Sequence, residues 1–339
     1  MRKKAVSILI VSAMLISASV MSGCSLFTLP GDSGSESGSS NSAGTQVFRV
    51  GFANLDNSDP NTYPAMLLFQ EYVESDAFAE AVGTPVEVLT ADSASDVETQ
   101  STNVETFLTR GVDMVFIVGV DTEANTTVVE MCNAENVPVF MVGTEASGGE
   151  WKFAGFDETD FGAVQGQWCA ENLPENSKIC LLTCMPGREV TTKRQDGFES
   201  AVAQREDLEI ISVQTGESSA ETAMQVTEDW ITAYGTEMDC IVAMDNIMAQ
   251  GVVEALAQNG LSDEVTVVSY VGSEEDAQLI KDGTIDAAVF CYWPSIGTLC
   301  GEIAQSVYVG EDVPERSNIE LYEMDATNVD QLIADVIGE

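Results

Sequence analysis

The sequence predicts an α/β protein built on two doubly wound parallel sheets. Short apolar runs rich in Val and Phe have the length of buried strands, and amphipathic helical stretches follow them. The same alternation starts again in the second half of the chain. Because strands that are joined through helices pair in parallel, each series of runs predicts one parallel sheet.

The first series occupies the chain from residue 46 to about residue 143. Its predicted strands read VFRVGFANL, VEVLTA, MVFIVGV and PVFMVG. Helical periodicity follows the first three of these strands, over residues 64–82, 96–109 and 122–136. These elements predict the first sheet and the helices that cover it.

The second series begins near residue 178. Its predicted strands read KICLLTCM, LEIISVQT, CIVAMDN, VTVVSYVG and IDAAVFCYW. They have the same apolar character as the first series and predict the second parallel sheet. Ligands of open parallel sheets bind beyond the carboxyl ends of the strands, so binding residues are expected just after each run.

The segment that precedes both series predicts export. Three basic residues stand within the first four positions, and an apolar stretch over residues 5–20 follows, which is the layout of a secretory signal. Cys24 comes directly after small or flexible residues, and this junction resembles the lipobox of bacterial lipoproteins. The resemblance implies a signal peptide over residues 1–23, a lipidated Cys24, and a flexible Gly/Ser tether over residues 24–45 that holds the protein on the extracytoplasmic face of the cell membrane. An ordinary signal peptide with a nearby cysteine is the alternative.

The charge of the chain is strongly acidic. Thirteen Lys and Arg stand against 56 Asp and Glu, and removal of the signal leaves ten of the basic residues and a formal charge of −46. Such a field repels phosphate backbones. We therefore expect no nucleic-acid partner.

The residue types of common active sites are missing. The chain has no His, which removes the commonest general base and the commonest zinc ligand. It has no G-x-S-x-G motif and no paired Cys and His that would form a nucleophile. We therefore expect a protein that is not an enzyme, without catalytic residues, a metal site or another cofactor.

The cysteines are interpreted as core residues. Eight occur, so lipidation of Cys24 leaves seven, and an odd number excludes a complete disulfide framework. Cys180 and Cys184 lie four residues apart in one predicted strand, which is about 13 Å and too far for a disulfide. Most of the thiols are therefore expected to pack as small apolar side chains.

Six segments of the folded part occur in the order and spacing of the type I periplasmic binding proteins. They read RVGFANLDN, FLTRGVDMVFIVGVDTEA, NAENVPVFMVGT, MPGREVTTKRQDGFESAVAQ, DCIVAMDNIMAQGVVEALAQNG and LIKDGTIDAAVFCYWPSIG. From residue 47 to about residue 322 the sequence resembles the sugar-binding branch of that family, which contains the ribose-binding protein. The resemblance implies a monomeric receptor that captures a small sugar-like ligand and delivers it to the permease and ATPase subunits of an ABC importer. A receptor that reports its ligand to a chemoreceptor or a sensor kinase is the alternative.

The resemblance also implies how the chain is threaded through two lobes. Three crossings are expected, near residues 154–156, near Tyr292 and near residues 319–321, and they form a three-segment hinge. The N-terminal lobe is expected to contain residues 46–153 and 293–319, and the C-terminal lobe residues 154–292 and 320–339. Closure of these lobes would enclose the ligand.

Ligand contacts are transferred from the family one position at a time. Asn57 and Tyr63 stand nearest to an asparagine and a stacking ring of the sugar binders, although packing of Tyr63 on its own lobe is the alternative. The Asp-Arg pair that holds sugar hydroxyls in the family is replaced by Gly143 and Thr144. Glu145 follows at once and is expected beside the ligand, with a solvated surface acid as the alternative. These positions form the predicted contribution of the N-terminal lobe.

The C-terminal lobe departs from the family in similar ways. Thr192 stands in the place of an arginine, with a helix N-cap as the alternative interpretation. Asp245 and Asn246 follow a strand where the family has one asparagine. At the second crossing, Tyr292 and Trp293 offer rings to the ligand. All five residues are expected to contact it.

A cluster of basic residues marks one loop of the C-terminal lobe. Arg188, Lys193 and Arg194 are three of the ten basic residues that remain after removal of the signal. Arg188 is expected to bind a carboxylate or phosphate group of the ligand. The alternative is structural, with Arg194 paired to neighbouring acids so that it holds the loop.

Tight binding of ribose itself is not expected. Besides the replaced residues above, a family aspartate becomes Val271 and a glutamine becomes Cys291 or Tyr292. A buried hydroxyl that loses its partner costs about 1–3 kcal/mol, and several such losses remove micromolar affinity. The sequence therefore predicts a modified or less hydroxyl-dense sugar, a nucleoside or an amphipathic metabolite.

Overall fold

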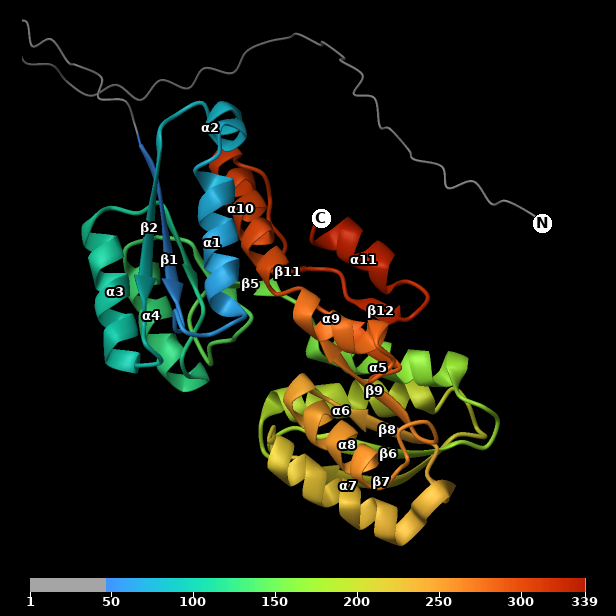
Figure 1. The fold of residues 1–339 in the computed structure, drawn as a ribbon. Coiled ribbons are helices and arrows are strands. Elements are labelled where there is room, and N and C mark those ends of the chain that lie inside the picture. The colour runs from blue at the N-terminus through green and yellow to red at the C-terminus, as the bar shows by residue number, and fades with distance from the viewer. Residues whose placement is uncertain (1–46, 339) are drawn as a thin grey trace, which may run out of the picture. The chain divides into compact units, whose positions relative to one another are not determined.

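The computed structural model describes residues 47–338 (Figure 1). The predicted signal peptide, Cys24 and the predicted tether lie outside these residues. Two six-stranded sheets, each covered by helices, account for the described part of the chain. The predicted α/β fold with two parallel sheets is confirmed, with one antiparallel exception at an edge.

The first sheet, called the β1 sheet, is parallel throughout. In spatial order its strands are β11 (Arg316–Asn318), β5 (Lys152–Gly155), β4 (Val139–Val142), β3 (Met114–Ile117), β1 (Phe48–Asn54) and β2 (Val86–Asp92). Every residue of β3 and β4 is buried. Helices lie against both faces of the sheet, which explains why these strands read as unbroken apolar runs.

Helices from two distant parts of the sequence cover the β1 sheet. They are α1 (Thr62–Val73), α2 (Asp76–Val82), α3 (Val97–Thr109), α4 (Thr122–Ala134) and α10 (Pro294–Val309). Figure 1 shows α1 and α10 together on one face and α3 and α4 on the other. α10 thus returns to the β1 sheet long after the other helices have formed.

The predicted helix over residues 64–82 is two helices rather than one. α1 ends at Val73, and the Ser75 hydroxyl accepts a hydrogen bond from the Phe78 N–H at 3.2 Å, which caps the start of α2. A Ser at an N-cap satisfies a backbone donor that has no partner within the helix. The apolar pattern of residues 64–82 is continuous, so it did not indicate the break between α1 and α2.

The second sheet, called the β6 sheet, contains five parallel strands and one antiparallel edge strand. In spatial order they are β12 (Tyr322–Asp325), β10 (Ala287–Phe290), β9 (Thr266–Val271), β8 (Cys240–Ala243), β6 (Lys178–Thr183) and β7 (Glu209–Thr215). β12 runs antiparallel to β10. This departs from the purely parallel prediction, because the chain enters β12 directly from a crossing and not through a helix.

The helices of the β6 sheet pack in close pairs. They are α5 (Glu158–Asn172), α6 (Glu189–Val202), α7 (Ala220–Tyr234), α8 (Asn246–Gln258), α9 (Glu274–Lys281) and α11 (Val329–Val336). α5 packs against α6, and a Cβ at Gly162 would lie 1.8 Å from the Arg194 carbonyl oxygen. The absent side chain lets the two helices approach closely, and this holds α6 in its place.

The chain passes between the two sheets three times. It leaves the β1 sheet after β5, returns after β10 through α10, and leaves again between β11 and β12. The connections are residues 156–157, 291–293 and 319–321. All three are short, so each one brings a strand end of one sheet close to the elements of the other.

The cysteines of residues 47–338 lie in the cores. All seven are free and buried: Cys132, Cys169, Cys180, Cys184, Cys240, Cys291 and Cys300. Their interpretation as small core residues is confirmed. Burial raises the pKa of the Cys132 and Cys180 thiols to about 12.

Membrane-spanning helices and metal-binding clusters are both absent from the described residues. No helix within residues 47–338 combines the length and the apolar character needed to cross a membrane. The same part of the chain holds no group of three or more Cys, Asp and Glu side chains that would suit a metal ion.

Candidate functional site

A cavity of about 370 Å³ lies where the carboxyl ends of the β1 sheet meet the start of α6. The β1 sheet and its loops contribute Thr122, Gly143, Thr144, Glu145, Phe153 and Arg316. Phe156 and Glu158, at the first crossing, and the segment around Arg188 and Lys193 complete the wall. The cavity lies at the strand ends where open parallel sheets bind ligands.

Ion pairs connect the two sides of this cavity. Glu145, just after β4, binds Arg316 of β11 at 2.8 Å and Lys193 of α6 at 3.6 Å. Lys193 also pairs with Glu189, one turn earlier on α6, at 2.8 Å. The hydrogen bond to Glu189, opposed by partial burial, raises the pKa of Lys193. Glu145 is therefore paired and not a solvated surface acid.

Arg194 holds the wall and does not line the cavity. Its Nε atom lies 2.6 Å from a Glu158 oxygen, and its Nη1 atom donates to the Met244 carbonyl oxygen at 2.8 Å. The guanidinium also lies 3.8 Å from the centre of the Phe161 ring. These contacts tie α6, α5 and the end of β8 together, so the structural interpretation of Arg194 is confirmed.

Aromatic side chains from the first two crossings pack at one side of the cavity. Gly143 has φ +61°, and a Cβ on this residue would lie 2.3 Å from the Trp293 ring. The Trp293 and Phe156 rings meet edge to face with centroids 5.8 Å apart. Trp293 thus packs behind the cavity wall, and Gly143 is the residue that leaves room for it.

The Thr144 hydroxyl lines the cavity but already has partners. It accepts a hydrogen bond from the Gly119 N–H at 2.9 Å and lies 3.4 Å from the Val142 carbonyl oxygen, to which it donates. A ligand at this position meets a hydroxyl that stabilises the β4 loop. Thr144 therefore has little capacity left for the ligand.

Asn57 and Tyr63 lie in the loop after β1 and at the start of α1, outside the cavity lining. The Asn57 side-chain Oδ1 atom accepts from the Asn54 side-chain amide at 2.9 Å, and the Asn57 backbone N–H donates to an Asp92 carboxylate oxygen at 3.3 Å. Tyr63 is half-buried against the core of the β1 sheet. The structure does not bring these two residues to Glu145 and Arg188.

Asp245 and Asn246 lie at the junction of β8 and α8. Asp245 caps α8 by accepting from the Met248 N–H at 2.8 Å, and its second oxygen accepts from the Cys184 thiol at 3.7 Å. The Asn246 amide lies 3.3 Å from Asp276. Both residues lie at the carboxyl edge of the β6 sheet, but neither lines the cavity.

Thr192 is an exposed residue inside α6. Arg188 occupies the N-cap position of this helix, so the alternative of Thr192 as an N-cap is wrong. α6 begins at Glu189, which is four residues earlier than a helix capped by Thr192 would begin. The Thr192 side chain does not line the cavity.

Tyr292 and Trp293 are adjacent in sequence, but their side chains lie in different places. Tyr292 lines a second hollow, of about 350 Å³, with Ile319 and Tyr322. This hollow lies at the second and third crossings. Of the ten predicted ligand-binding residues, Thr144, Glu145 and Arg188 line the 370 Å³ cavity, and Trp293 supports its wall.

Several residues that line the cavity were not predicted from the sequence. Phe153, Phe156, Glu158 and Arg316 all line it. Arg316 is one of only ten basic residues that follow the first four positions, and it stands next to the predicted third crossing. Its rarity and its position were a usable signal, whereas nothing in the local pattern marked Phe153.

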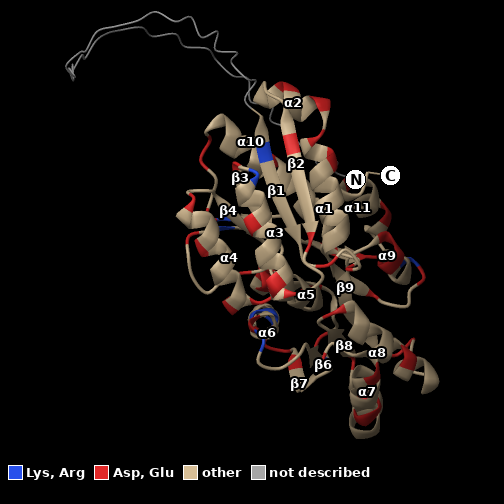
Figure 2. Ribbon diagram, turned by 90° about the vertical axis from the view of Figure 1, so that its left-hand side faces the viewer, with Lys and Arg blue, Asp and Glu red and all other residues tan. Residues whose placement is uncertain are grey.

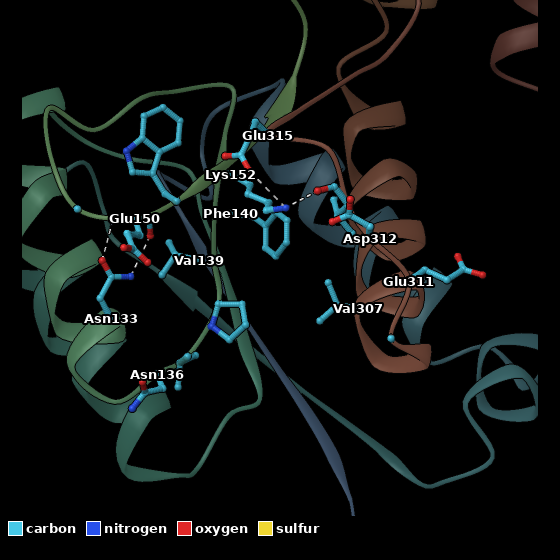
Figure 3. Close-up of a pocket in the computed structure, with 16 residues that line it drawn as sticks. Asn133, Asn136, Val139, Phe140, Glu150, Lys152, Val307, Glu311, Asp312 and Glu315 are labelled. Atoms are coloured by element: carbon cyan, nitrogen blue, oxygen red, sulfur yellow. Dashed lines mark hydrogen bonds and ion pairs between the residues drawn. The ribbon is translucent and has the colours of Figure 1, made fainter. Parts of the chain in front are cut away.

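A hollow larger than this cavity lies elsewhere and has another character. It has a volume of about 810 Å³ and lies at the amino ends of β4 and β5 (Figure 3). Its polar groups bind one another: Asn133 and Glu150 exchange two hydrogen bonds, and Lys152 pairs with Glu315 at 3.6 Å. Because ligands of open parallel sheets bind at the carboxyl ends, the smaller cavity is the better candidate.

The sequence is similar to a family of binding proteins and to individual members of it. Residues 69–312 match the profile of the periplasmic binding protein domain family. The chain is 25% identical to the ribose import binding protein of Bacillus subtilis (strain 168) over 314 residues, which cover 92% of this chain and 95% of the relative. It is 27% identical to the ribose import binding protein of Escherichia coli (strain K12) over 244 residues, covering 72% and 81%.

A solved structure of a solute binding protein has a similar fold over most of this chain. The ABC transporter solute binding protein of Bacillus halodurans C-125 with bound myo-inositol superposes with a TM-score of 0.69 at 25% identity. The superposition covers 87% of this chain and 99% of that protein.

Proposed function

The chain belongs to the periplasmic binding protein family, and from this premise we propose that it captures a small sugar-like solute for an ABC importer. The observation that carries the proposal is the 370 Å³ cavity, whose wall comes from both sides of the three crossings. Binding pockets for small molecules have volumes of about 300–1,000 Å³, so this one suits a single small ligand. The names of the two ribose relatives and the bound myo-inositol of the solved relative support a sugar or polyol.

The proposed mechanism is closure of two lobes. The β1 sheet with α1–α4 and α10 forms one lobe, and the β6 sheet with α5–α9 and α11 forms the other. Residues 156–157, 291–293 and 319–321 serve as the hinge, because small changes in φ and ψ at short parallel connections move whole lobes. The pairing of Glu145 with Lys193 across the cavity supports this arrangement, since it joins groups that closure brings together.

Lobe closure separates the ligand from water and changes the outer surface of the receptor. A ligand that contacts both lobes binds the closed form more tightly, and it shifts the population by that difference in affinity. The permease of the importer would recognise the closed form and open it at the membrane. A monomeric receptor is sufficient for this cycle.

We further propose that the receptor is held on the extracytoplasmic face of the membrane through Cys24. The support comes from the signal-like start and the lipobox-like junction in the sequence, followed by a segment without large apolar side chains. Two or more acyl chains anchor a protein stably. Cys24→Ala should abolish labelling with a lipid precursor and release the protein from the membrane fraction, and a variant that stays bound and labelled would contradict the tether.

Binding of the solute is tested by thermal shift with pentoses, hexoses, polyols and their derivatives. A ligand at about one hundred times its Kd stabilises the folded protein by about 2.7 kcal/mol, which raises the Tm by several degrees. We expect at least one sugar or polyol to do so, and ribose not to bind at micromolar concentration. The absence of any shift across the panel would contradict the proposed function.

A further inference from the structure

We propose that the solute carries a carboxylate and that Arg188 is the residue that binds it. The inference deepens the proposed function, on which it rests, by naming the chemical class of the ligand: an acidic sugar of monosaccharide size, such as a hexuronate. Arg188 lines the 370 Å³ cavity and is exposed to solvent there.

Basic residues gather at this cavity in a chain that has few of them. Ten Lys and Arg follow the first four residues, against 56 Asp and Glu. Four of the ten lie at the cavity or directly behind its wall: Arg188, Lys193, Arg194 and Arg316. Figure 2 shows the Lys and Arg colour on α6 among strands and helices that are otherwise marked mainly by acids. The field of the whole molecule repels anions, so an anion needs such a local group of cations.

Each acid at the cavity already has a basic partner. Glu145 pairs with Arg316 and Lys193, at 2.8 and 3.6 Å. Glu158 pairs with Arg194 at 2.6 Å, and Glu189 pairs with Lys193 at 2.8 Å. These contacts use three of the four cations.

Arg188 is the cation that remains. Among the described residues Arg188 makes no ion pair. The other three cations are paired in the same, strongly acidic chain. A guanidinium presents its donors as a fork that fits both oxygens of a carboxylate. One unpaired positive charge matches one carboxylate better than the two charges of a phosphate monoester.

The size and the polar groups of the cavity support the same class. A volume of about 370 Å³ is near the lower end for ligand pockets and suits one sugar ring. The Thr144 hydroxyl is already occupied by Gly119 and Val142, so it offers little to a neutral sugar. A charged group would therefore supply a large part of the recognition.

The test compares acidic sugars with their neutral partners by calorimetry. The pairs are glucuronate with glucose, galacturonate with galactose, and gluconate with sorbitol, and glucose 6-phosphate is added as a dianion. Arg188→Gln removes the proposed partner. Arg110→Gln is the matched control, because it removes the same charge from the exposed end of α3. Arg188→Lys keeps the charge and loses the fork.

The expected result is that an acidic member of a pair binds at least about ten-fold more tightly than its neutral partner, because hydrogen bonds to charged groups contribute about 1.5–3 kcal/mol. Arg188→Gln should remove that preference, Arg188→Lys should keep part of it, and Arg110→Gln should change the affinity by less than about two-fold.

Three results would overturn the inference while the proposed function stands. The first is that the neutral member binds more tightly in each pair that binds. The second is that glucose 6-phosphate binds more tightly than every carboxylate. The third is that an acidic sugar binds Arg188→Gln with the same affinity as it binds the unaltered protein. If no member of the panel binds, the inference fails, and the thermal-shift panel then decides the proposed function separately.

Discussion

Gly143 shows at the scale of one residue how the backbone shapes the candidate site. It follows β4, adopts φ +61°, and leaves the space that the Trp293 ring fills. An L side chain at this position meets two obstacles, an unfavourable backbone conformation and a ring 2.3 Å from its Cβ. Arg188 differs, because its position depends on where α6 begins and not on a close contact.

Gly143→Ala should lower the free energy of unfolding by about 2 kcal/mol or more, since it adds a clash to the cost of positive φ. Gly260→Ala is the matched control: its φ is +69°, and nothing lies within 4 Å of its added Cβ. Urea unfolding of both variants separates the two costs. Equal losses would show that the Trp293 contact is unimportant.

The individual site residues were only partly predictable from the sequence. Glu145 and Arg188 could be selected because a rare charge or a position after a strand marks them. The partners of Glu145 could not be predicted, because Arg316 and Lys193 approach it from remote segments. The different positions of the Tyr292 and Trp293 side chains could not be predicted either, because they depend on how α10 begins. The roles of the ten residues in binding stay predictions.

At the scale of the elements, strands with a continuous apolar run were predictable, and strands without one, at a sheet edge or next to it, were not. β3 and β4 read as MVFI and VFMV and are buried throughout. β5, β11 and β12 read as KFAG, RSN and YEMD and lack a continuous apolar run. Their pairing depends on neighbouring strands, so local patterns do not reveal them.

The folded protein should lose stability steeply above pH 9. Burial raises the pKa of Cys132 and Cys180 to about 12 and that of Cys184 to about 11, from an ordinary value of 9.0. The native state therefore holds these protons more tightly than the unfolded state. The contribution of these thiols to the free energy of unfolding is complete below pH 9 and is lost as the pH rises from 9 toward 11 or 12. The free energy of unfolding falls by about 1.4 kcal/mol for each thiol and each pH unit in this range.

Urea unfolding between about pH 8 and pH 10.5 measures this loss, within the range that the thiol pKa values define. Cys180→Ala should unfold more easily at pH 7, because it leaves a cavity, but its stability should fall less steeply with pH. A stability that stays constant over this range in the unaltered protein would contradict the burial of the thiols.

At the scale of the whole molecule, the excess of acids dominates the behaviour in salt. With 56 acidic and 13 basic residues, most carboxylates have no positive partner. Their mutual repulsion is screened as the Debye length falls from about 30 Å at 0.01 M salt to about 3 Å at 1 M. Net charge of one sign destabilises the compact state.

The Tm should therefore rise when NaCl is increased from about 0.05 M to about 0.5 M, because the screening of repulsion outweighs the weakening of a few ion pairs. KCl at equal concentration is the control and should act in the same way. A Tm that falls with either salt would show that the ion pairs, such as those around Lys193, dominate the stability.

The central claim is that two lobes close around a solute, and small-angle X-ray scattering tests it most directly. The sugar found by the binding panel is added at saturation to the full chain, and tryptophan emission is recorded in parallel because Trp293 packs at the second crossing. The account predicts a smaller radius of gyration and a changed emission that Trp293→Phe reduces. An unchanged radius of gyration and an unchanged emission at saturation would contradict it.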